Sequence, residues 1–252
     1  MRIHFVSSTN DKSRSAFRHM TELYGQAQLE EADCLVVLSG DGMMLRALHE
    51  TSELGIPIYG MNCGEIGFLT NVYRPDNLLS RIKNAIPLEI SPLKITATRP
   101  SGETFSTMAV NELYLLRESH QAAKIRIKVN EVTRIDELIC DGIIAATAIG
   151  STAYNYSAGG PIIPVGTELM ALTPISPFRP RGWRGALLPS DTVLDFEIID
   201  HDRRSVCAVA DYIEFRHVCQ VRVLQKNEHP LTLLFDADNL LKDKFLSEQF
   251  AV

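Results

Sequence analysis

The sequence has few cysteines and lacks any long apolar run. Its 252 residues include five cysteines without a CxxC pair, a pattern that disfavours a disulfide framework or a zinc ribbon. No stretch of about 18 apolar residues occurs, so no transmembrane helix is predicted. The N-terminal stretch MRIHFVSSTNDK turns polar after Val6, so it is unlike a signal peptide. We therefore expect a soluble, cytoplasmic protein with reduced thiols.

The charge balance lacks a basic excess. The chain carries 25 Lys and Arg residues against 31 Asp and Glu residues, for a formal net charge of −6. This balance gives no reason to expect a nucleic-acid or membrane partner. With 45% hydrophobic and 22% charged residues, the composition is typical of a globular protein that is long enough to bury a core.

The first part of the chain, residues 1–88, alternates apolar runs with helical patterns. RIHFVSS, DCLVVLSG and IPIYGMN are continuous apolar runs, while DKSRSAFRHMTELYGQ, GMMLRALHETSELG and PDNLLSRIKNA have helical character. Apolar strands that alternate with helices are typical of a parallel sheet covered on both faces. The sequence therefore predicts a Rossmann-like α/β domain over residues 1–88.

The second part, residues 89–236, has the period of two that is typical of strands. In KIRIKV (124–129), basic side chains alternate with apolar ones, which places them on opposite faces of a strand. Similar alternation recurs further on, so we predict an antiparallel, β-rich second domain over residues 89–236. The tail FDADNLLKDKFLSEQF predicts a last helix, over residues 237–252, that packs back onto the first domain.

The stretch LVVLSGDGMMLRALHE places Asp41 between two glycines where a strand passes into a helix. The N–H groups of a helix N-terminus favour phosphate, and Gly40 and Gly42 allow positive φ and a close approach of phosphate oxygens. Asp41 would repel phosphate, but it could bind Mg²⁺ or accept a proton from an attacking hydroxyl. On spacing alone, a helix N-cap is the favoured alternative. Neither a Walker A motif nor a GxGxxG fingerprint is present.

Three further strings follow the glycine turn: NCGEIGFLT (62–70), NELYLL (111–116) and DGIIAATAIGSTAYNYSAGGPI (141–162). Together and in this order, the four strings resemble those of the NAD kinase family. The resemblance implies transfer of the γ-phosphoryl group of ATP to the 2′-hydroxyl of the adenosine ribose of NAD, giving NADP. It also implies a divalent metal ion, with Mg²⁺ expected, and a homodimer or homotetramer. ATP and NAD are then the substrates.

The resemblance also implies roles for individual residues. Asp41 matches the catalytic base, and no residue is assigned as a metal ligand. Asn111 and Glu112 match the pair that holds the adenosine and ribose groups of NAD. The residues expected to bind the nucleotides are Gly40, Gly42, Phe68, Asn111, Glu112, Asp141, Ser151, Thr152, Ala153, Tyr154, Ser157 and Asp211. Among these, residues 152–154 would frame the adenine, Phe68 would form a pocket wall, and Asp211 would lie near the phosphorylation site.

The chain departs from the family pattern at four places. Ser39 occupies the position of the first glycine of GGDG. If the backbone at that position has a positive φ, a serine there is strained. Met43 occupies a position where the family has threonine, and Ile149 one where the family has a hydroxyl-bearing residue. Tyr212 replaces the glycine that follows the aspartate at 211. Two alternatives stay open at this point. One is a lipid kinase of the diacylglycerol type, which shares the GGDG turn, and the other is a catalytically silent NAD-binding sensor.

Overall fold

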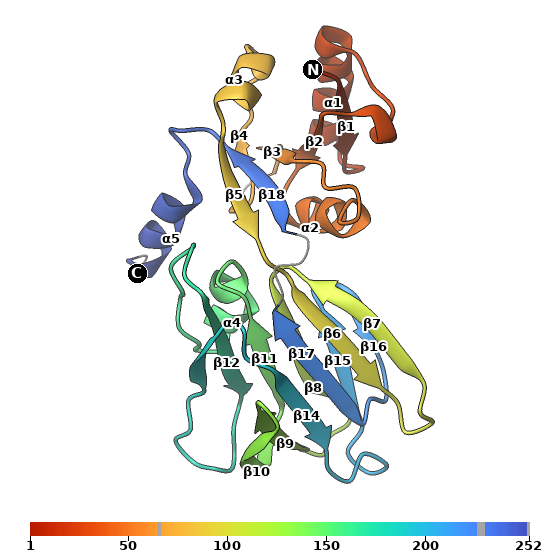
Figure 1. The fold of residues 1–252 in the computed structure, drawn as a ribbon, viewed down its shortest axis with the longest axis vertical. Helices are drawn as coiled ribbons and strands as arrows, with labels where there is room; N and C mark the ends of the chain where they lie inside the picture. The colour runs from red at the N-terminus through yellow and green to blue at the C-terminus, as the bar shows by residue number, and fades with distance from the viewer. Residues whose placement is uncertain (65–66, 226–229, 251–252) are drawn as a thin grey trace. The chain divides into compact units, whose positions relative to one another are not determined.

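The structure is a computed structural model, and it describes residues 1–64, 67–225 and 230–250. The chain divides into two compact units. The first comprises Met1–Ser91 and Glu228–Val252, and the second comprises Pro92–Asn227. Figure 1 colours the chain from red at the N-terminus to blue at the C-terminus, so the first unit contains both the red and the blue ends.

The first unit is built on a mixed sheet with strand order β1-β2-β3-β18-β5, and β4 pairs with β3. The strands are β1 (Ile3–Ser7), β2 (Cys34–Ser39), β3 (Ile58–Asn62), β4 (Asn71–Val72), β5 (Ile86–Ile90) and β18 (Leu231–Phe235). All neighbours are parallel except β5, which runs antiparallel to β18. The predicted α/β class is confirmed, with one antiparallel edge strand added to the parallel sheet.

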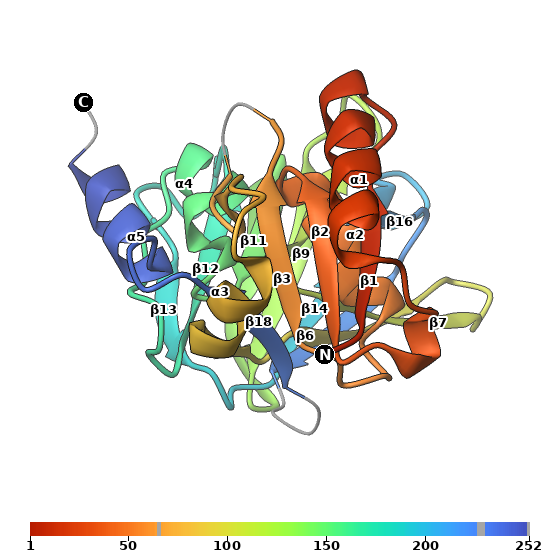
Figure 2. The same cartoon turned by 90° about the horizontal axis from the view of Figure 1, so that it is seen from above.

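Helices cover both faces of this sheet. The helices of this unit are α1 (Asp11–Tyr24), α2 (Asp41–Glu50), α3 (Leu78–Asn84), α5 (Leu241–Gln249) and the short 3-10 turn η1 (Leu29–Glu31), and of these α1, α2 and α3 pack on the sheet. Val36 of β2 and Tyr59 of β3 share an apolar cluster with side chains of α1 and α3, and Figure 2 shows α1 lying along β1 and β2. Successive side chains of a strand face opposite ways, so Gly60 faces the other side. A Cβ on Gly60 would lie 2.6 Å from the Met44 sulfur of α2, so α2 covers that face.

The described part of the second unit forms two six-stranded antiparallel sheets. One has the order β10-β9-β14-β17-β6-β7, with β6 (Leu93–Thr98), β7 (Thr104–Ala109), β9 (Ala123–Val129), β10 (Val132–Cys140), β14 (Leu194–Ile198) and β17 (Gln220–Gln225). The other has the order β13-β12-β11-β8-β15-β16, with β8 (Glu112–Arg117), β11 (Gly142–Ala146), β12 (Leu169–Ile175), β13 (Ala186–Pro189), β15 (Val206–Ala210) and β16 (Ile213–Phe215). Two short helices, η2 (Gly150–Thr152) and α4 (Tyr154–Ser157), follow β11.

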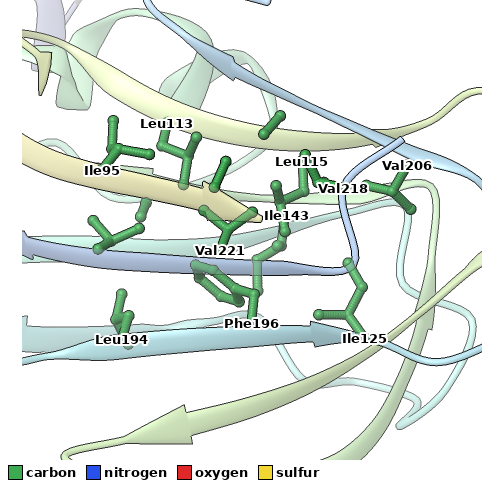
Figure 3. Packing of buried hydrophobic residues seen from close by; sticks show 14 of the residues in the cluster. Ile95, Leu113, Leu115, Ile125, Ile143, Leu194, Phe196, Val206, Val218 and Val221 are labelled. Carbon is green, nitrogen blue, oxygen red and sulfur yellow. The ribbon is translucent and has the colours of Figure 1, made fainter. Parts of the chain in front are cut away.

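Apolar side chains from both sheets form one core in the second unit. Ile125 and Phe196 of one sheet belong to the same buried cluster as Leu115 and Ile143 of the other (Figure 3). The polar positions of β9 face away from this core and form ion pairs with Glu197 and Glu137. The alternation in KIRIKV therefore reflects a strand with one buried face and one partly exposed face. The predicted β-rich antiparallel class of this part is confirmed.

The predicted limits of the second domain are wrong at its C-terminal end. β18 was expected within residues 89–236, but it belongs to the sheet of the first unit, where it pairs with β3 and β5. A short run such as LTLLF has the same pattern in either sheet, because the pattern reports burial and not the identity of the neighbouring strand. Residues 226–229 of the predicted domain lie outside the described residues.

The last helix is shorter than the predicted range of 237–252. α5 covers Leu241–Gln249 and buries Leu241 and Phe245 within the first unit. Residues 251 and 252 lie outside the described residues. Across the part of the chain that the structure describes, no helix has the length and apolar character needed to cross a membrane.

Candidate functional site

The strand-to-helix turn of the first unit lies at residues 39–42. Ser39 ends β2, Gly40 is the N-cap of α2, and Asp41 is the first helical residue. Gly40 is extended, with φ −97° and ψ −171°, and neither Ser39 nor Gly42 has a positive φ. The two glycines therefore do not use the positive φ that glycine allows, and Ser39 is not strained. The strand passes into the helix through one extended residue, which requires no left-handed backbone.

Gly42 matters for the space around it rather than for its dihedral angles. A Cβ at this position would meet no atom within 4 Å. The first turn of α2 therefore has open space beside it. The Met43 N–H donates to the Gly40 carbonyl at 3.2 Å, so the amides of Asp41 and Gly42 are the ones that ordinarily lack an intrahelical partner. With open space beside it, this turn can accept an anionic group.

Asp41 does not cap its own helix, so that alternative is wrong. Its Oδ2 accepts a hydrogen bond from the Phe68 N–H at 2.8 Å, and its Oδ1 accepts one from the Leu69 N–H at 2.9 Å. Burial raises the pKa of the Asp41 carboxyl, while the two N–H groups and the Lys244 ammonium lower it. The GDG turn and the NCGEIGFLT segment are thus joined through this carboxylate. Glu65 and Ile66 of that segment lie outside the described residues.

Lys244 of α5 contacts the same segment. Its ammonium donates to the carbonyl oxygens of Gly67 at 3.0 Å, Phe68 at 3.2 Å and Thr70 at 2.6 Å. The Phe68 ring also meets the Phe245 ring edge-on, with 6.3 Å between the centroids. Phe68 lines a surface depression with residues of α5 and of the loop before it. Sequence reasoning assigned no function to Lys244, since no motif contains it.

In the second unit, Asp211 holds the start of β8. Its carboxylate accepts hydrogen bonds from the N–H groups of Val110 at 2.7 Å, Asn111 at 2.9 Å and Glu112 at 3.3 Å. Asp211 has a φ of +53°, so the left-handed residue of the β15–β16 turn is the aspartate itself. A glycine is consequently not needed at Tyr212, and the departure from the family pattern there is explained.

Glu112 is a buried carboxyl with an unsatisfied oxygen. The residue is 7% exposed, and its Oε2 has no hydrogen-bond partner among the described residues. Burial and the negative charge of Asp211 raise the pKa of Glu112 to about 8. A buried polar atom without a partner costs free energy. A ligand hydroxyl that donates to Glu112 would remove that cost.

The segment after β11 is packed directly against Asn111. The Thr147 N–H donates to the Asn111 carbonyl at 2.9 Å, and the Thr147 hydroxyl donates to the Val110 carbonyl at 2.7 Å. A Cβ on Gly150 would lie 2.1 Å from the Asn111 carbonyl oxygen. Glycine at 150 therefore allows the GSTAY segment to lie against the Asn111 backbone.

Within this segment, the Ser151 hydroxyl forms hydrogen bonds to the backbone of its own loop. The residue is fully buried, and its hydroxyl donates to the Ala148 carbonyl at 2.6 Å and accepts from the Ile163 N–H at 2.9 Å. Thr152, Ala153 and Tyr154 are half-buried and Ser157 is exposed. These four residues are reachable by a ligand, whereas the Ser151 hydroxyl is not.

Tyr154 and Asn155 show how α4 is fixed. The Tyr154 ring packs edge-on against Tyr114 of β8, with 5.1 Å between the centroids. Asn155, which sequence reasoning did not single out, is fully buried. Its side chain donates to the Ser151 and Pro161 carbonyls and accepts from the Thr173 hydroxyl. Its place between two tyrosines in a polar loop gave no signal of burial.

Asp141 is not brought together with the other predicted residues of the second unit. In the β11–β8 pair, Gly142 lies opposite Leu116 and Ala146 lies opposite Glu112. Asp141 therefore lies one strand length from Glu112, roughly 15 Å at the usual rise per residue. It forms an ion pair with Arg117 at 2.6 Å. The two strings are continuous in sequence, but β11 separates their ends in space.

The described residues also limit how a metal ion could be held. Among residues 1–64, 67–225 and 230–250, no group of three His, Cys, Asp or Glu side chains could bind one. Magnesium needs only one or two carboxylates when substrate phosphates and waters supply the remaining ligands. An ion held mainly by the phosphates of the nucleotide would therefore need no cluster of protein side chains.

Two sequence families match most of the chain. The ATP-NAD kinase N-terminal domain matches residues 3–88, and the ATP-NAD kinase C-terminal domain matches residues 110–241. The chain belongs to the NAD kinase family. It is 48% identical to a protein named NAD kinase from Xylella fastidiosa (strain 9a5c), over 100% of this chain and 96% of that one. It is 46% identical to a protein of the same name from Rhizobium meliloti (strain 1021), over 98% of this chain and 96% of that one.

Solved structures of the family have the same fold. The crystal structure of an NAD kinase from Archaeoglobus fulgidus in complex with ATP matches with a TM-score of 0.79 and 25% identity, over 100% of both chains. The yeast NADH kinase complexed with NADH matches with a TM-score of 0.85 and 19% identity, over 99% of this chain and 87% of that one. At 19% identity, the second match bears on the fold alone. The predicted family and two-part architecture are confirmed, and the lipid-kinase and silent-sensor alternatives have no support.

Proposed function

We propose that the chain transfers the γ-phosphoryl group of ATP to the 2′-hydroxyl of the adenosine ribose of NAD, giving NADP and ADP. Family membership over the whole chain supports the reaction class. The observation that carries the mechanism is the Asp41 carboxylate, which two backbone N–H groups orient at the start of α2. Phosphoryl transfer depends mainly on such positioning and on charge stabilisation.

Asp41 is the proposed general base. Each oxygen of a carboxylate can accept more than one hydrogen bond, so both retain capacity beyond the Phe68 and Leu69 N–H groups. As the bond between the 2′-oxygen and the γ-phosphorus forms, the hydroxyl proton passes to Asp41. The bond from that phosphorus to the β,γ-bridging oxygen breaks, and its electron pair leaves with ADP. The burial that raises the pKa of Asp41 makes it a stronger base.

The first turn of α2 is the proposed contact for the donor phosphates. Gly40 is the N-cap of this turn, and an added Cβ at Gly42 would fill space that is open now. Magnesium, when bound, neutralises charge on the transferring phosphates. The residues present fit an ion that is carried mainly by the nucleotide, with Asp41 as the nearby carboxylate. The divalent metal is thus part of this proposal.

The second unit is proposed to bind NAD. Glu112 would accept hydrogen bonds from ribose hydroxyls, because its Oε2 is buried without a partner. Asn111 lies beside it, and residues 152–154 would frame the adenine, with Ser157 exposed at the end of α4. Ser151 and Asp211 would support these residues through hydrogen bonds within the unit. Phe68 is proposed to form a wall of the dinucleotide pocket through its ring.

A direct assay tests the proposal. Purified protein is incubated with ATP, Mg²⁺ and NAD, and the nucleotides are separated by chromatography; NADP is expected to form in step with ADP. Omitting each reactant in turn gives the matched controls. Folded protein that binds NAD in calorimetry but forms no NADP with ATP or inorganic polyphosphate would contradict the proposal. A parallel assay with NADH in place of NAD shows whether the reduced dinucleotide is also phosphorylated.

The proposal includes a cytoplasmic homodimer or homotetramer, as the family resemblance implies. Large apolar side chains on the second unit, such as Phe178 at 56% and Leu187 at 51% exposure, are consistent with a further interface. Light scattering coupled to size exclusion gives the subunit number directly, and a monomer at micromolar concentration would remove this part.

A further inference from the structure

The backbone segment 67–70 is held between two charged side chains that are far apart in the sequence. On one side, the Asp41 carboxylate accepts from the N–H groups of Phe68 and Leu69. On the other, the Lys244 ammonium donates to the carbonyls of Gly67, Phe68 and Thr70. All of these residues belong to the first unit. The segment is therefore oriented with N–H groups toward the anion and C=O groups toward the cation.

The hydrogen bonds of Lys244 define how it can act. An ammonium group has three donors, and three carbonyl oxygens accept from it at 2.6–3.2 Å. Its donors are therefore used by the backbone and are not directed at a phosphate. Any effect of Lys244 on Asp41 must pass through the segment that both side chains bind, and through the field of its charge.

The surroundings of Lys244 fix it in place. Burial lowers the pKa of the Lys244 ammonium and the charge of Asp41 raises it, so the two groups stabilise each other's charged forms. Phe245, the next residue on α5, is buried and meets the ring of Phe68. The helix thus contacts the segment through both a charge and an apolar side chain.

We propose that Lys244 is a positioning residue for Asp41 and acts through the backbone of residues 67–70. This inference rests on the proposed role of Asp41 as the base. It makes α5, which carries none of the recognised motifs, part of the apparatus that orients the reacting group. Because carboxylate placement within fractions of an ångström affects proton transfer, loosening the segment lowers turnover more than substrate binding.

The central variant is Lys244→Met, which keeps an unbranched stem and removes the ammonium. We expect kcat to fall roughly 10- to 100-fold, with KM for ATP and NAD changed less than about threefold. Lys244→Arg retains charge and donors and is expected to recover most of the activity. Lys242→Met is the matched control, since Lys242 is exposed on the same helix, and it should leave kcat unchanged.

The pH profile separates positioning from a general loss of structure. The base must be ionised to act, and the Lys244 charge lowers the pKa of Asp41. Lys244→Met therefore raises that pKa, and the acid limb of kcat/KM moves to higher pH. The limb should stay in place in Lys242→Met. A purely structural role for Lys244 would lower activity at every pH without moving the limb.

Two readouts do not depend on turnover. Amide hydrogen exchange at Phe68 and Leu69 should speed up in Lys244→Met, and the carboxyl ¹³C titration of Asp41 should move to higher pH. If the wild-type protein formed no NADP, the proposed function would fail while these readouts still tested the hold on the segment. Should Lys244→Met unfold, Lys244→Gln keeps a donor without the charge and replaces it. Wild-type kcat, acid limb and amide protection in the folded variant would overturn the inference.

Discussion

Asp41 in the first unit and Glu112 in the second are carboxyl groups whose pKa is raised by burial. They differ in hydrogen bonding: both Asp41 oxygens accept a backbone N–H, whereas Glu112 keeps a buried oxygen without a partner among the described residues. A carboxylate that is already satisfied is fixed in direction before any ligand binds. An unsatisfied one gains partners when a ligand arrives. The difference fits a base in one unit and a binding group in the other.

The largest expected effect comes from removing the charge of the oriented carboxyl. Asp41→Asn should lower kcat by about 10²–10⁴-fold, the usual contribution of a positioned base. The asparagine side chain has one oxygen and one NH₂ group, so it can accept from only one of the N–H groups of residues 68 and 69. The other N–H loses its acceptor, and we expect the free energy of unfolding to fall by about 1 kcal/mol. NADP formation and thermal unfolding measure the two effects. Turnover near the wild-type rate would remove Asp41 from the catalytic role.

The unsatisfied carboxyl should respond in binding instead. Above pH 8, where Glu112 is ionised, Glu112→Gln is expected to raise the Kd for NAD by roughly 10- to 100-fold, since hydrogen bonds to a charged group contribute about 1.5–3 kcal/mol. At saturating NAD, kcat should change much less than in Asp41→Asn. Calorimetry and steady-state kinetics test the split. Equal losses in kcat for both variants would break the contrast between the two carboxyls.

The pKa of Glu112 also predicts a stability effect with a definite sign. Its pKa is about 8 in the folded chain against an ordinary 4.5, so the folded state binds more protons between these values. The free energy of unfolding should therefore fall as pH rises through this window, by at most about 1.4 kcal/mol per pH unit. Denaturant titrations of wild type and Glu112→Gln measure it. The variant should lose this slope and become the more stable protein at pH 8; parallel curves would contradict the assignment.

Steric contact in the second unit gives the next prediction. Gly150→Ala places a Cβ 2.1 Å from the Asn111 carbonyl oxygen, which forces the segment and the Asn111 backbone apart. Overpacking of this kind costs about 1–3 kcal/mol, and NAD affinity should fall along with the free energy of unfolding. Chemical denaturation and NAD titration provide the measurement. A variant with unchanged stability would show that the contact relaxes without cost.

Features that depend on the local sequence pattern could be predicted, whereas features that depend on contacts between distant residues could not. The period of KIRIKV and the apolar runs of β2 and β3 gave the two-part fold, because burial is recorded locally. The placement of β18 was not predictable, because its partner strands lie far away in the sequence. Likewise, motifs identified Asp41 and Glu112 but not Lys244, whose importance arises only from tertiary hydrogen bonds.

Asp211 and Asp141 also show that a motif does not determine where a side chain lies. The sequence placed both among the binding residues. The structure directs Asp211 toward the backbone of residues 110–112, and β11 carries Asp141 away from Glu112. A motif states that a carboxylate is present, but the direction in which it points depends on the turn and strand that carry it.

The smallest expected effect on folding belongs to Gly42. A Cβ there meets nothing within 4 Å and the residue has no positive φ, so Gly42→Ala should leave stability unchanged or raise it by up to about 1 kcal/mol through helix propensity. The methyl group would occupy the open space beside the first turn of α2, so KM for ATP should rise severalfold while the Kd for NAD stays constant. Gly55→Ala, in which φ is +62°, is the contrasting control and should lose stability without affecting KM. An unchanged KM in Gly42→Ala would place the donor phosphates elsewhere and weaken the assignment of this turn.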